Sequence, residues 1–345
     1  MVAVTGAAGH IGANLVRALI GEERTVRAVL NKDDRALQGL PVETVRADVL
    51  DEQSLLQAFR GARYVYHLAA KITLTRDDSL QAMKVNLEGT RNVIRACLAC
   101  NTKRLVYFGS IHALDPFPKD GTVDESRRLI GESECSVMHS VRGRQAHECG
   151  PYDRSKAAAE REVLKACEEG LDAVVVSPTA VVGPYDFKPS QFGRTLLAIL
   201  QGKHRFLVQG GFDWVDARDV AAGAVAAERS GKKGERYILS VGWRSVGEVM
   251  KTADGIIGGT TVRAQVPMWA ARACLPFGRA FLKHSMVGTV FTKDSLFVLR
   301  HYRHVSSKKA AEELAFRPRP FTRTLKDTIE WFSENGYLKR RTGIG

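Results

Sequence analysis

The sequence predicts an α/β fold, a doubly wound parallel sheet followed by a smaller, mainly helical C-terminal lobe. Short β-branched runs alternate with amphipathic helical stretches through the first half of the chain, and such alternation builds a parallel sheet covered by helices on both faces. A glycine-rich turn joins the first strand to the first helix, and after Pro178 shorter helices are punctuated by proline and glycine. With 345 residues, 44% of them hydrophobic, the chain can bury one large core and a smaller annex.

The strands expected in the sheet are the β-branched runs Val2–Thr5, Thr25–Leu30, Glu43–Ala47, Arg63–Ala69, Arg104–Phe108 and Ala173–Ser177. The helices expected between them are Ile11–Gly21, Glu52–Arg60, Leu80–Asn101 and Tyr152–Gly170. In the second half we expect only brief strands, near Arg205–Val208 and Arg236–Leu239.

This pattern predicts two domains. We expect residues 1–178 to form the sheet domain, with residues 213–241 returning to it. Residues 179–212 and 242–345 are expected to form a lobe over the sheet edge where ligands bind. The polar segment Asp115–Gly150 has no clear periodicity, which is typical of a flap or surface excursion.

Composition argues against several function classes. The net charge is +13, but the basic residues are interleaved with acidic and apolar ones, which favours a solvated basic face over a nucleic-acid-binding surface. The apolar segment Val266–Phe291 contains Arg272, Arg279 and Lys283, so a helix over a substrate pocket is favoured over membrane insertion or a helix lying on a membrane. The N-terminus has no secretion signal, and the six cysteines, Cys97 and Cys100 included, suggest ordinary thiols in a reducing compartment. We therefore expect a cytoplasmic protein without a metal site.

The turn Gly6-Ala7-Ala8-Gly9-His10-Ile11-Gly12 lies between the first strand and the first helix. Glycines in such a turn let the backbone approach a pyrophosphate, and the helix N-terminus presents free N–H groups to it. In an alternating βα chain this arrangement predicts a dinucleotide site of the Rossmann type.

The residues after the second strand bear on which dinucleotide binds. Asn31 stands where NAD-specific enzymes tend to place an acid, and Lys32 and Arg35 can meet a 2′-phosphate. This favours NADP(H), although the neighbouring Asp33 and Asp34 keep NAD(H) open. Asp48-Val49 follows the third strand, where the carboxylate can accept a hydrogen bond from adenine or serve only as a helix-start acid.

Tyr152 and Lys156 are one turn apart at the start of a predicted helix, so both side chains face the same way. A nearby ammonium is expected to lower the tyrosine pKa toward the working pH, which suits a proton-transferring group. Ser110 follows the strand Arg104–Phe108, where its hydroxyl can donate to a substrate oxygen. These three residues are the predicted catalytic set.

Together these segments resemble the extended short-chain dehydrogenase/reductase family over nearly the whole chain. The matching segments are Thr5 to Gly12, Asp48-Val49, His67-Leu68-Ala69-Ala70, Asn86-Leu87-Glu88-Gly89-Thr90, Gly109-Ser110, Tyr152 with Lys156, Ser177-Pro178-Thr179, Val182-Gly183-Pro184, Asp213 to Asp216, Asp219-Val220 and Trp331-Phe332. The resemblance implies catalysis by Ser110, Tyr152 and Lys156. It further implies cofactor contacts from Leu68, Ala69, Ala70, Lys71, Asn86, Pro178 and Thr179. It also implies a homodimer formed by the helices Leu80–Asn101 and Tyr152–Gly170.

Within this family the same residues serve reductases and nucleotide-sugar epimerases or dehydratases. Nucleotide-sugar members usually carry an asparagine where this chain has Ala180, and a diphosphate-binding arginine where it has Phe212. The pattern is closer to the dihydroflavonol reductase branch. The substrate contacts expected are aromatic, Phe187, Phe212 and Trp214; His112 and Lys188, with Arg194, can hold a small anion or serve ordinary surface and packing roles.

The favoured hypothesis is an NADP(H)-dependent reductase of a ketone or aldehyde, with Tyr152 as proton donor and Ser110 holding the substrate oxygen. One alternative is an NAD-dependent epimerase or dehydratase acting on a sugar or sugar nucleotide. Another is a dinucleotide-sensing regulator or scaffold, although such relatives typically lose the tyrosine or the lysine that this chain keeps.

Overall fold

The structure is a computed structural model that describes residues 1–31, 33–73, 78–118, 121–131, 150–203, 206–260, 264–273 and 293–338. Lys32, which the sequence assigns to the cofactor, lies outside the described residues, as do residues 132–149 of the expected flap.

Seven parallel strands form the main sheet, in the order β10-β6-β5-β4-β1-β2-β3. Their bounds are β1 Val2–Thr5, β2 Val26–Leu30, β3 Glu43–Arg46, β4 Tyr64–His67, β5 Arg104–Phe108, β6 Ala173–Pro178 and β10 Arg236–Leu239. The strand order reverses between β1 and β4, where a doubly wound sheet opens a crevice beyond the carboxyl ends of its strands. The predicted fold class is confirmed.

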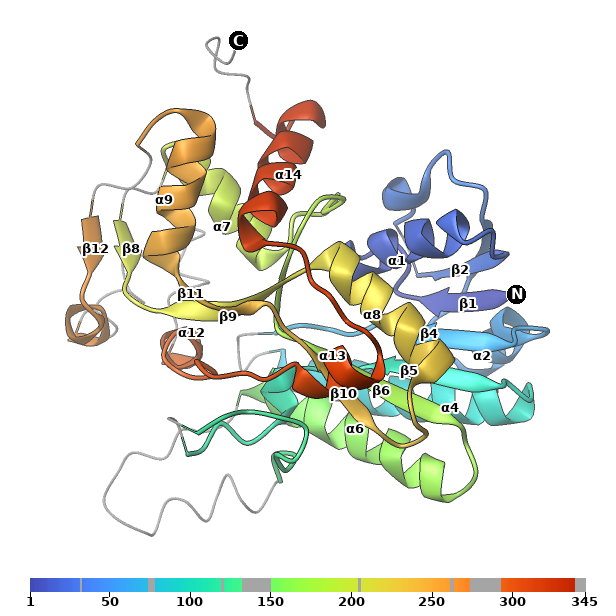
Figure 1. Cartoon of the computed structure of the whole chain (residues 1–345). Coiled ribbons are helices and arrows are strands. Elements are labelled where there is room, and N and C mark those ends of the chain that lie inside the picture. Colours follow the sequence, from blue (N-terminus) through green and yellow to red (C-terminus); the bar gives the residue numbers. More distant parts are fainter. Residues whose placement is uncertain are drawn as a thin grey trace.

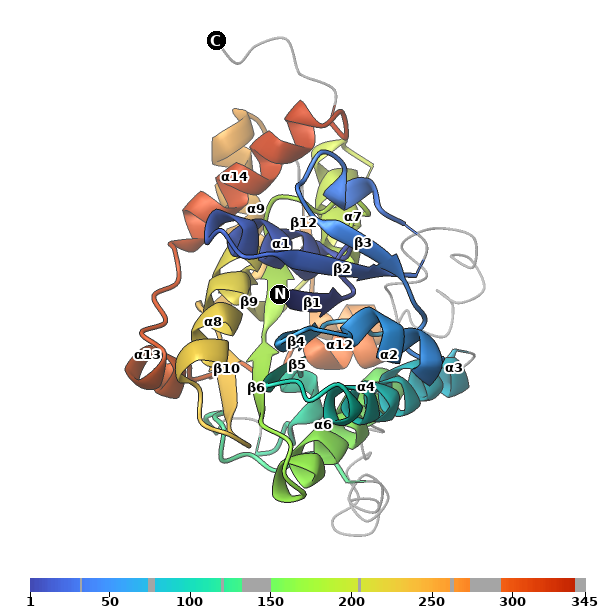
Figure 2. The same cartoon turned by 90° about the vertical axis from the view of Figure 1, so that its right-hand side faces the viewer.

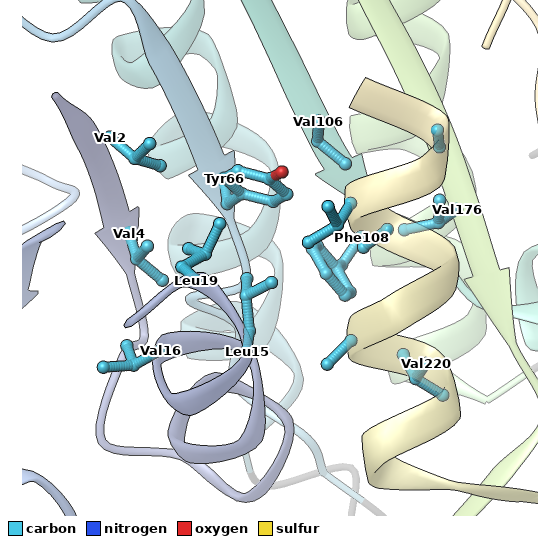
Figure 3. Packing of buried hydrophobic residues seen from close by; sticks show 14 of the residues in the cluster. Val2, Val4, Leu15, Val16, Leu19, Tyr66, Val106, Phe108, Val176 and Val220 are labelled. Atoms are coloured by element: carbon cyan, nitrogen blue, oxygen red, sulfur yellow. The ribbon is translucent and has the colours of Figure 1, made fainter. Parts of the chain in front are cut away.

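Helices cover both faces of this sheet (Figure 2). One face packs against α1 (His10–Gly21) and α8 (Ala217–Ser230), and the other against α2 (Glu52–Phe59), α4 (Gly89–Ala99) and α6 (Pro151–Glu168). Successive strand residues point to opposite faces, so Val2 and Val4 face α1 while Ala3 lies in the cluster on the other side. Figure 3 shows Leu15, Val16 and Leu19 of α1 lying over these strands, with Val220 of α8 beside them. Because both faces are covered, the strands read as nearly continuous apolar runs.

The lobe lies beyond the carboxyl ends of the strands (Figure 1). Its main helices are α7 (Gln191–Leu200), α9 (Val246–Ile257) and α14 (Phe321–Glu334). The short helices α12 (Lys293–Val298) and α13 (Lys308–Glu313) come between α9 and α14 in the chain, and Ala310 of α13 packs in the core of the main sheet. Its core is aromatic and includes Trp214 and Phe332, both nearly inaccessible to solvent.

The lobe contains more β-structure than the sequence predicts. A three-stranded sheet joins β7 (Ala180–Val182), β9 (Gly211–Asp216) and β11 (Gly242–Ser245), and a two-stranded sheet pairs β8 (Phe206–Val208) with β12 (Ala264–Val266). These strands have three to six residues and several begin at glycine, which hides their periodicity. The sequence predicts that the segment 213–241 returns to the main sheet as a whole. In the structure β9 belongs to the small sheet, whereas β10 joins the main sheet and α8 packs against it.

The single helix expected over Leu80–Asn101 is divided in the structure. It consists of α3 (Ser79–Met83), a π-helical turn (Lys84–Glu88) and α4. Such turns are frequent at functional sites because they change the direction of a few side chains. Asn86, a predicted cofactor residue, lies within this turn.

Candidate active site

Glycines in the loop between β1 and α1 let three backbone segments lie close together: the loop itself, the start of α1 and the residues after β4. Gly6 has a positive φ of +69°, and a Cβ there would lie 2.8 Å from the amide nitrogen of Ala69. A Cβ on Gly12 would lie 2.2 Å from the carbonyl oxygen of Gly6. Gly9 is the N-cap of α1, whose first turn has no acidic residue and no side-chain cap. The free N–H groups of this turn, including those of His10 and Ile11, therefore remain open to an anion, so the loop fits a dinucleotide diphosphate.

The side chain of His10 lies against the lobe. Its Nε2 is 3.1 Å from the carbonyl oxygen of Gly183 and 3.2 Å from that of Pro184, and Asn14 donates to the Pro184 carbonyl at 3.0 Å. His10 thus contributes its backbone to the predicted phosphate site and its ring to the contact between α1 and the start of the lobe.

The loops after β2 and β3 meet at the opposite end of the predicted cofactor site. Asn31 donates to the Asp48 carboxylate at 3.3 Å, and Val49 packs against the bare Cα of Gly89. Arg35 is exposed and donates twice to Asp33, with a shortest N–O distance of 2.8 Å. Hydrogen bonds from its guanidinium and its backbone N–H, with a smaller contribution from Lys188, lower the pKa of Asp33 to about 2.

A hydrogen-bonded clamp joins the loop after β4 to helix α6. Asn86 accepts from the backbone N–H of Lys71 at 2.7 Å, donates to its carbonyl at 3.0 Å, and donates to Ser155 Oγ at 2.8 Å. Ser155 in turn donates to the carbonyl of Tyr152 at 2.7 Å. Loop residues Leu68, Ala69 and Ala70 lie partly or fully exposed at the sheet's carboxyl edge. The clamp fixes this loop relative to the predicted catalytic helix.

The structure brings Ser110, Tyr152 and Lys156 together. Ser110 begins the 3₁₀ turn Ile111–Ala113 after β5, and its hydroxyl lies close enough to the Tyr152 side chain to lower the pKa of that phenol. Lys156 lies one turn further along α6, where its Nζ donates to the carbonyl of Phe108 at 2.5 Å and lies 4.5 Å from the ring centre of Tyr107. Parallel strands present their carboxyl ends at one edge, which explains why residues 42 positions apart meet here.

The protonation of this set differs from the expectation. Burial raises the pKa of Tyr152 to about 12, and the nearby Ser110 hydroxyl offsets only part of this rise. Burial lowers the pKa of Lys156 to about 8. The expected lowering of the tyrosine pKa by the lysine is wrong for this arrangement, because the ammonium lies against the Phe108 carbonyl and desolvation dominates. Tyr152 is therefore a phenol at neutral pH and holds a proton to give.

Beneath Lys156 lies a buried ion pair that the sequence analysis missed. Glu160, one turn further along α6, is fully buried and pairs with Arg236 of β10 at 2.5 Å. Burial raises the pKa of Glu160, while Arg236 and Lys156 offset part of that rise. Its Oε2 has no hydrogen-bond partner among the described residues, and a Cβ on Gly109 would lie 2.8 Å from it. Gly109 thus lets this carboxylate lie directly behind Ser110 and support the Lys156 charge.

His112 connects the catalytic tyrosine with the C-terminal half of the chain. Its ring centre is 6.4 Å from that of Tyr152 and 5.3 Å from that of Tyr302. Burial lowers the pKa of His112, so its ring is neutral at physiological pH. Tyr302 is buried and donates to the carbonyl of Leu114 at 3.1 Å. The predicted position of His112 beside the reacting groups agrees with this geometry.

The predicted aromatic substrate contacts Phe187, Phe212 and Trp214 pack in the lobe. Trp214 is 1% exposed and packs in the lobe core, with its ring centre 4.5 Å from that of Phe192 and 5.3 Å from that of Phe212. Phe187 packs edge-on against Trp331, while exposed Lys188 acts on Asp33 near the loop after β2. Phe187 and Lys188 therefore lie toward the Arg35 end of the site, and Trp214 serves packing.

Pro178 and Thr179 lie where β6 leaves the main sheet. The N–H of Thr179 donates to the carbonyl of Leu239 at 3.1 Å. Nearby Asp213 accepts from Ser240 at 2.7 Å, and burial raises its pKa to about 6.

No group of metal-binding side chains gathers in the part of the chain that the structure describes. Nor does any helix there have the length and apolarity to cross a membrane.

Comparisons with known proteins agree with this geometry. Residues 2–242 match the family model described as the NAD dependent epimerase/dehydratase family. The chain is similar to "Sterol demethylase protein B" of Methylococcus capsulatus, with 31% identity over 97% of this chain and 99% of that protein. It is also similar to "Putative dihydroflavonol 4-reductase" of Synechocystis, with 30% identity over 97% and 95%. The crystal structure of gox2253 is similar with a TM-score of 0.83 and 29% identity, covering 98% of this chain and 99% of that chain.

Proposed function

The chain belongs to the NAD-dependent epimerase/dehydratase family and is an NAD(P)-dependent enzyme of the extended short-chain dehydrogenase/reductase type; on that premise, we propose that it reduces a ketone or an aldehyde with NADPH. The observation that carries this proposal is the assembly of Ser110, Tyr152 and Lys156 where β5 ends and α6 begins. A buried phenol with a pKa of about 12 is a proton donor at neutral pH. Reduction of a carbonyl requires such a donor at the developing alkoxide.

Each group of the site has one task in this reaction. The glycine loop and the first turn of α1 hold the diphosphate, and Lys156 binds the nicotinamide ribose. When bound, the dinucleotide supplies the hydride. Ser110 donates a hydrogen bond to the substrate oxygen, and Tyr152 gives that oxygen its proton. The ammonium of Lys156, supported by Glu160, adds positive charge near the oxygen as negative charge develops there.

The epimerase or dehydratase alternative rests on family membership. Against it, Ala180 and Phe212 replace the asparagine and arginine that usually anchor a sugar nucleotide. Phe212 packs edge-on against Trp214 and offers no hydrogen bond to a diphosphate from its side chain. The similarity to a putative dihydroflavonol 4-reductase supports the reductase. The regulator alternative is less favoured because Ser110, Tyr152 and Lys156 are all present and assembled.

A carbonyl screen tests the proposal. Purified protein and NADPH are mixed with a panel of aromatic and aliphatic ketones and aldehydes, and loss of NADPH absorbance is followed together with the alcohol product. We expect at least one member to give NADPH consumption and alcohol in equal amounts. A panel that gives none, together with interconversion of a sugar without net NADPH loss, contradicts the reductase.

We also propose that Arg35 selects NADP(H). Arg35 follows β2, the strand after which this fold expects the adenosine ribose, and its guanidinium can move from Asp33 to a 2′-phosphate. Arg35→Ala is expected to weaken NADPH binding roughly tenfold, the loss of one charge-assisted contact, while leaving NADH binding within about twofold. Titration calorimetry with both dinucleotides measures this ratio.

The matched control is Arg60→Ala. Arg60 is exposed at the end of α2, and its carbonyl contacts Arg27 of β2, so it lies toward the opposite edge of the sheet. An equal loss of NADPH affinity in both variants contradicts a specific role for Arg35.

The homodimer remains a prediction. Leu80 and Leu98 are 85% and 47% exposed on α3 and α4, where the resemblance places the subunit contact.

A further inference from the structure

A second cavity lies in the lobe, away from the residues of the candidate active site. It has a volume of about 350 Å³ and is lined by Gln209, Gly210, Met268, Trp269, Arg272, Arg300 and Arg303. Its floor is the turn between β8 and β9. There Gly210 has a positive φ of +143°, and an added Cβ would lie 2.7 Å from the carbonyl oxygen of Leu299. Only glycine allows this approach, so the cavity depends on a specific backbone arrangement.

Three arginines give the cavity a strong positive charge. Among the described residues, none of the three forms a salt bridge, and the Arg303 guanidinium lies over the Trp243 ring, 5.1 Å from its centre. The flanking sequence is poor in acids, since Asp294 is the only one between Ala264 and Ala311. Unpaired guanidinium groups around one cavity are typical of a site for carboxylate or phosphate, which they bind in a bidentate manner.

The cavity also offers an aromatic surface. Trp269 is 75% exposed, the highest value among the large aromatic side chains of the described residues. An indole face left in solvent beside three guanidinium groups suits a ligand that carries a planar ring next to its acidic group.

The same short segment reaches both the cavity and the active site. Arg300 and Arg303 line the cavity, while Tyr302 between them points the other way, into contact with His112. Tyr302 has a left-handed φ of 55°, which turns the chain between the two directions. A ligand held by these arginines is thus two ring contacts, Tyr302 to His112 and His112 to Tyr152, from the proton donor.

We propose that this cavity is an anion-binding site for the phosphate or carboxylate of a ring-bearing ligand. The acidic group lies between Arg272, Arg300 and Arg303, and its ring stacks on Trp269. The acid belongs either to the far end of the substrate or to a separate small molecule, and the two sources share this chemistry. The site goes beyond the proposed function, since binding here is measured without turnover.

Phenyl phosphate is the probe, with benzyl alcohol as its neutral counterpart. Binding to the full-length protein is measured by titration calorimetry in saturating NADP⁺, which occupies the dinucleotide phosphate site. We expect one saturable site, tighter for phenyl phosphate than for inorganic phosphate, and no binding of benzyl alcohol. The variant Arg300→Gln/Arg303→Gln is expected to bind phenyl phosphate at least about tenfold more weakly, because two charge-assisted contacts are lost. Trp269→Leu is expected to remove the advantage of phenyl phosphate over inorganic phosphate.

The matched control is Arg323→Gln/Lys326→Gln, which removes the same charge from two exposed i,i+4 ion pairs on α14. Unchanged affinity in this control supports the site. An equal loss in both double variants, or no saturable binding to the wild type, overturns the proposal. If a carbonyl substrate is in hand, competition by phenyl phosphate assigns the cavity to the substrate, whereas a change in kcat without competition assigns it to a separate ligand.

Discussion

Tyr152→Phe is expected to abolish turnover while cofactor affinity stays nearly unchanged. The substitution removes the phenol that lies beside Ser110 and carries a proton at neutral pH. Loss of a positioned general acid typically lowers the rate by about 100-fold to 10,000-fold. The dinucleotide loop, Lys156 and the Asn86 clamp are untouched, since the clamp reaches residue 152 through its backbone carbonyl. Steady-state assays and NADPH titration calorimetry measure the two quantities.

Tyr185→Phe is the matched control. This phenol is half-buried beneath the Arg17 guanidinium, 4.3 Å from its ring centre, and has no contact with Ser110. We expect near wild-type turnover from it. A Tyr152→Phe variant with full activity contradicts the mechanism, and a variant that also loses NADPH binding points to a structural defect.

Arg236→Met is expected to destabilise the protein by roughly 3–5 kcal/mol at neutral pH, the usual cost of leaving one partner of a buried ion pair alone. Arg236 is 8% exposed, and its partner Glu160 is completely buried behind Ser110. The variant also loses a hydrogen bond from Arg236 to the Glu125 carbonyl. Urea unfolding of the wild type and the variant gives the difference in free energy.

The pH dependence of this difference in free energy tests whether the unpaired charge is the Glu160 carboxylate. Burial raises the pKa of Glu160 above its ordinary 4.5, and loss of Arg236 raises it further. Below pH 4.5 the carboxyl is protonated in both the folded and the unfolded state, so the penalty for burying its charge is absent there. As pH rises toward the folded-state pKa the unfolded state ionises first, and the penalty grows to its full value. The destabilisation by Arg236→Met is therefore expected to be smaller in acid than at neutral pH.

Two comparisons make this prediction sharp. Arg91 pairs with Glu162 on the same helix α6, but these side chains are 45% and 30% exposed, so Arg91→Met is expected to cost at most about 1 kcal/mol. The double variant Arg236→Met/Glu160→Met removes both buried charges and is expected to be more stable than Arg236→Met alone. A cost for Arg236→Met no larger than for Arg91→Met contradicts the role given to the buried pair.

The sequence predicts most of the main sheet because its periodicity is local. Each strand is a β-branched run, and each helix begins close to where its pattern begins, as with α1 at His10 and α6 at Pro151. The meeting of Ser110 with Tyr152 was also predictable, since parallel strands present their carboxyl ends at a single edge.

Other features depend on packing that no local pattern encodes. Glu160 and Arg236 are 76 residues apart, and they pair only because β10 lies beside β6 in the sheet. Trp214 carries the same local signal as a pocket residue, but the position of β9 between β7 and β11 places it in the lobe core. Lys188 lies near Asp33 because the turn after β7 packs against α1, which the sequence of the turn does not reveal.

A carbonyl reductase must exchange its cofactor at every turnover. The most direct test denatures freshly purified protein and measures the identity and stoichiometry of the released nucleotide, followed by NADPH and NADH titration of the native protein. A reductase must release its oxidised cofactor, so we expect little bound nucleotide and tighter binding of NADPH than of NADH. An epimerase regenerates its cofactor within each cycle, so near-stoichiometric NAD retained through purification would contradict the proposed reductase.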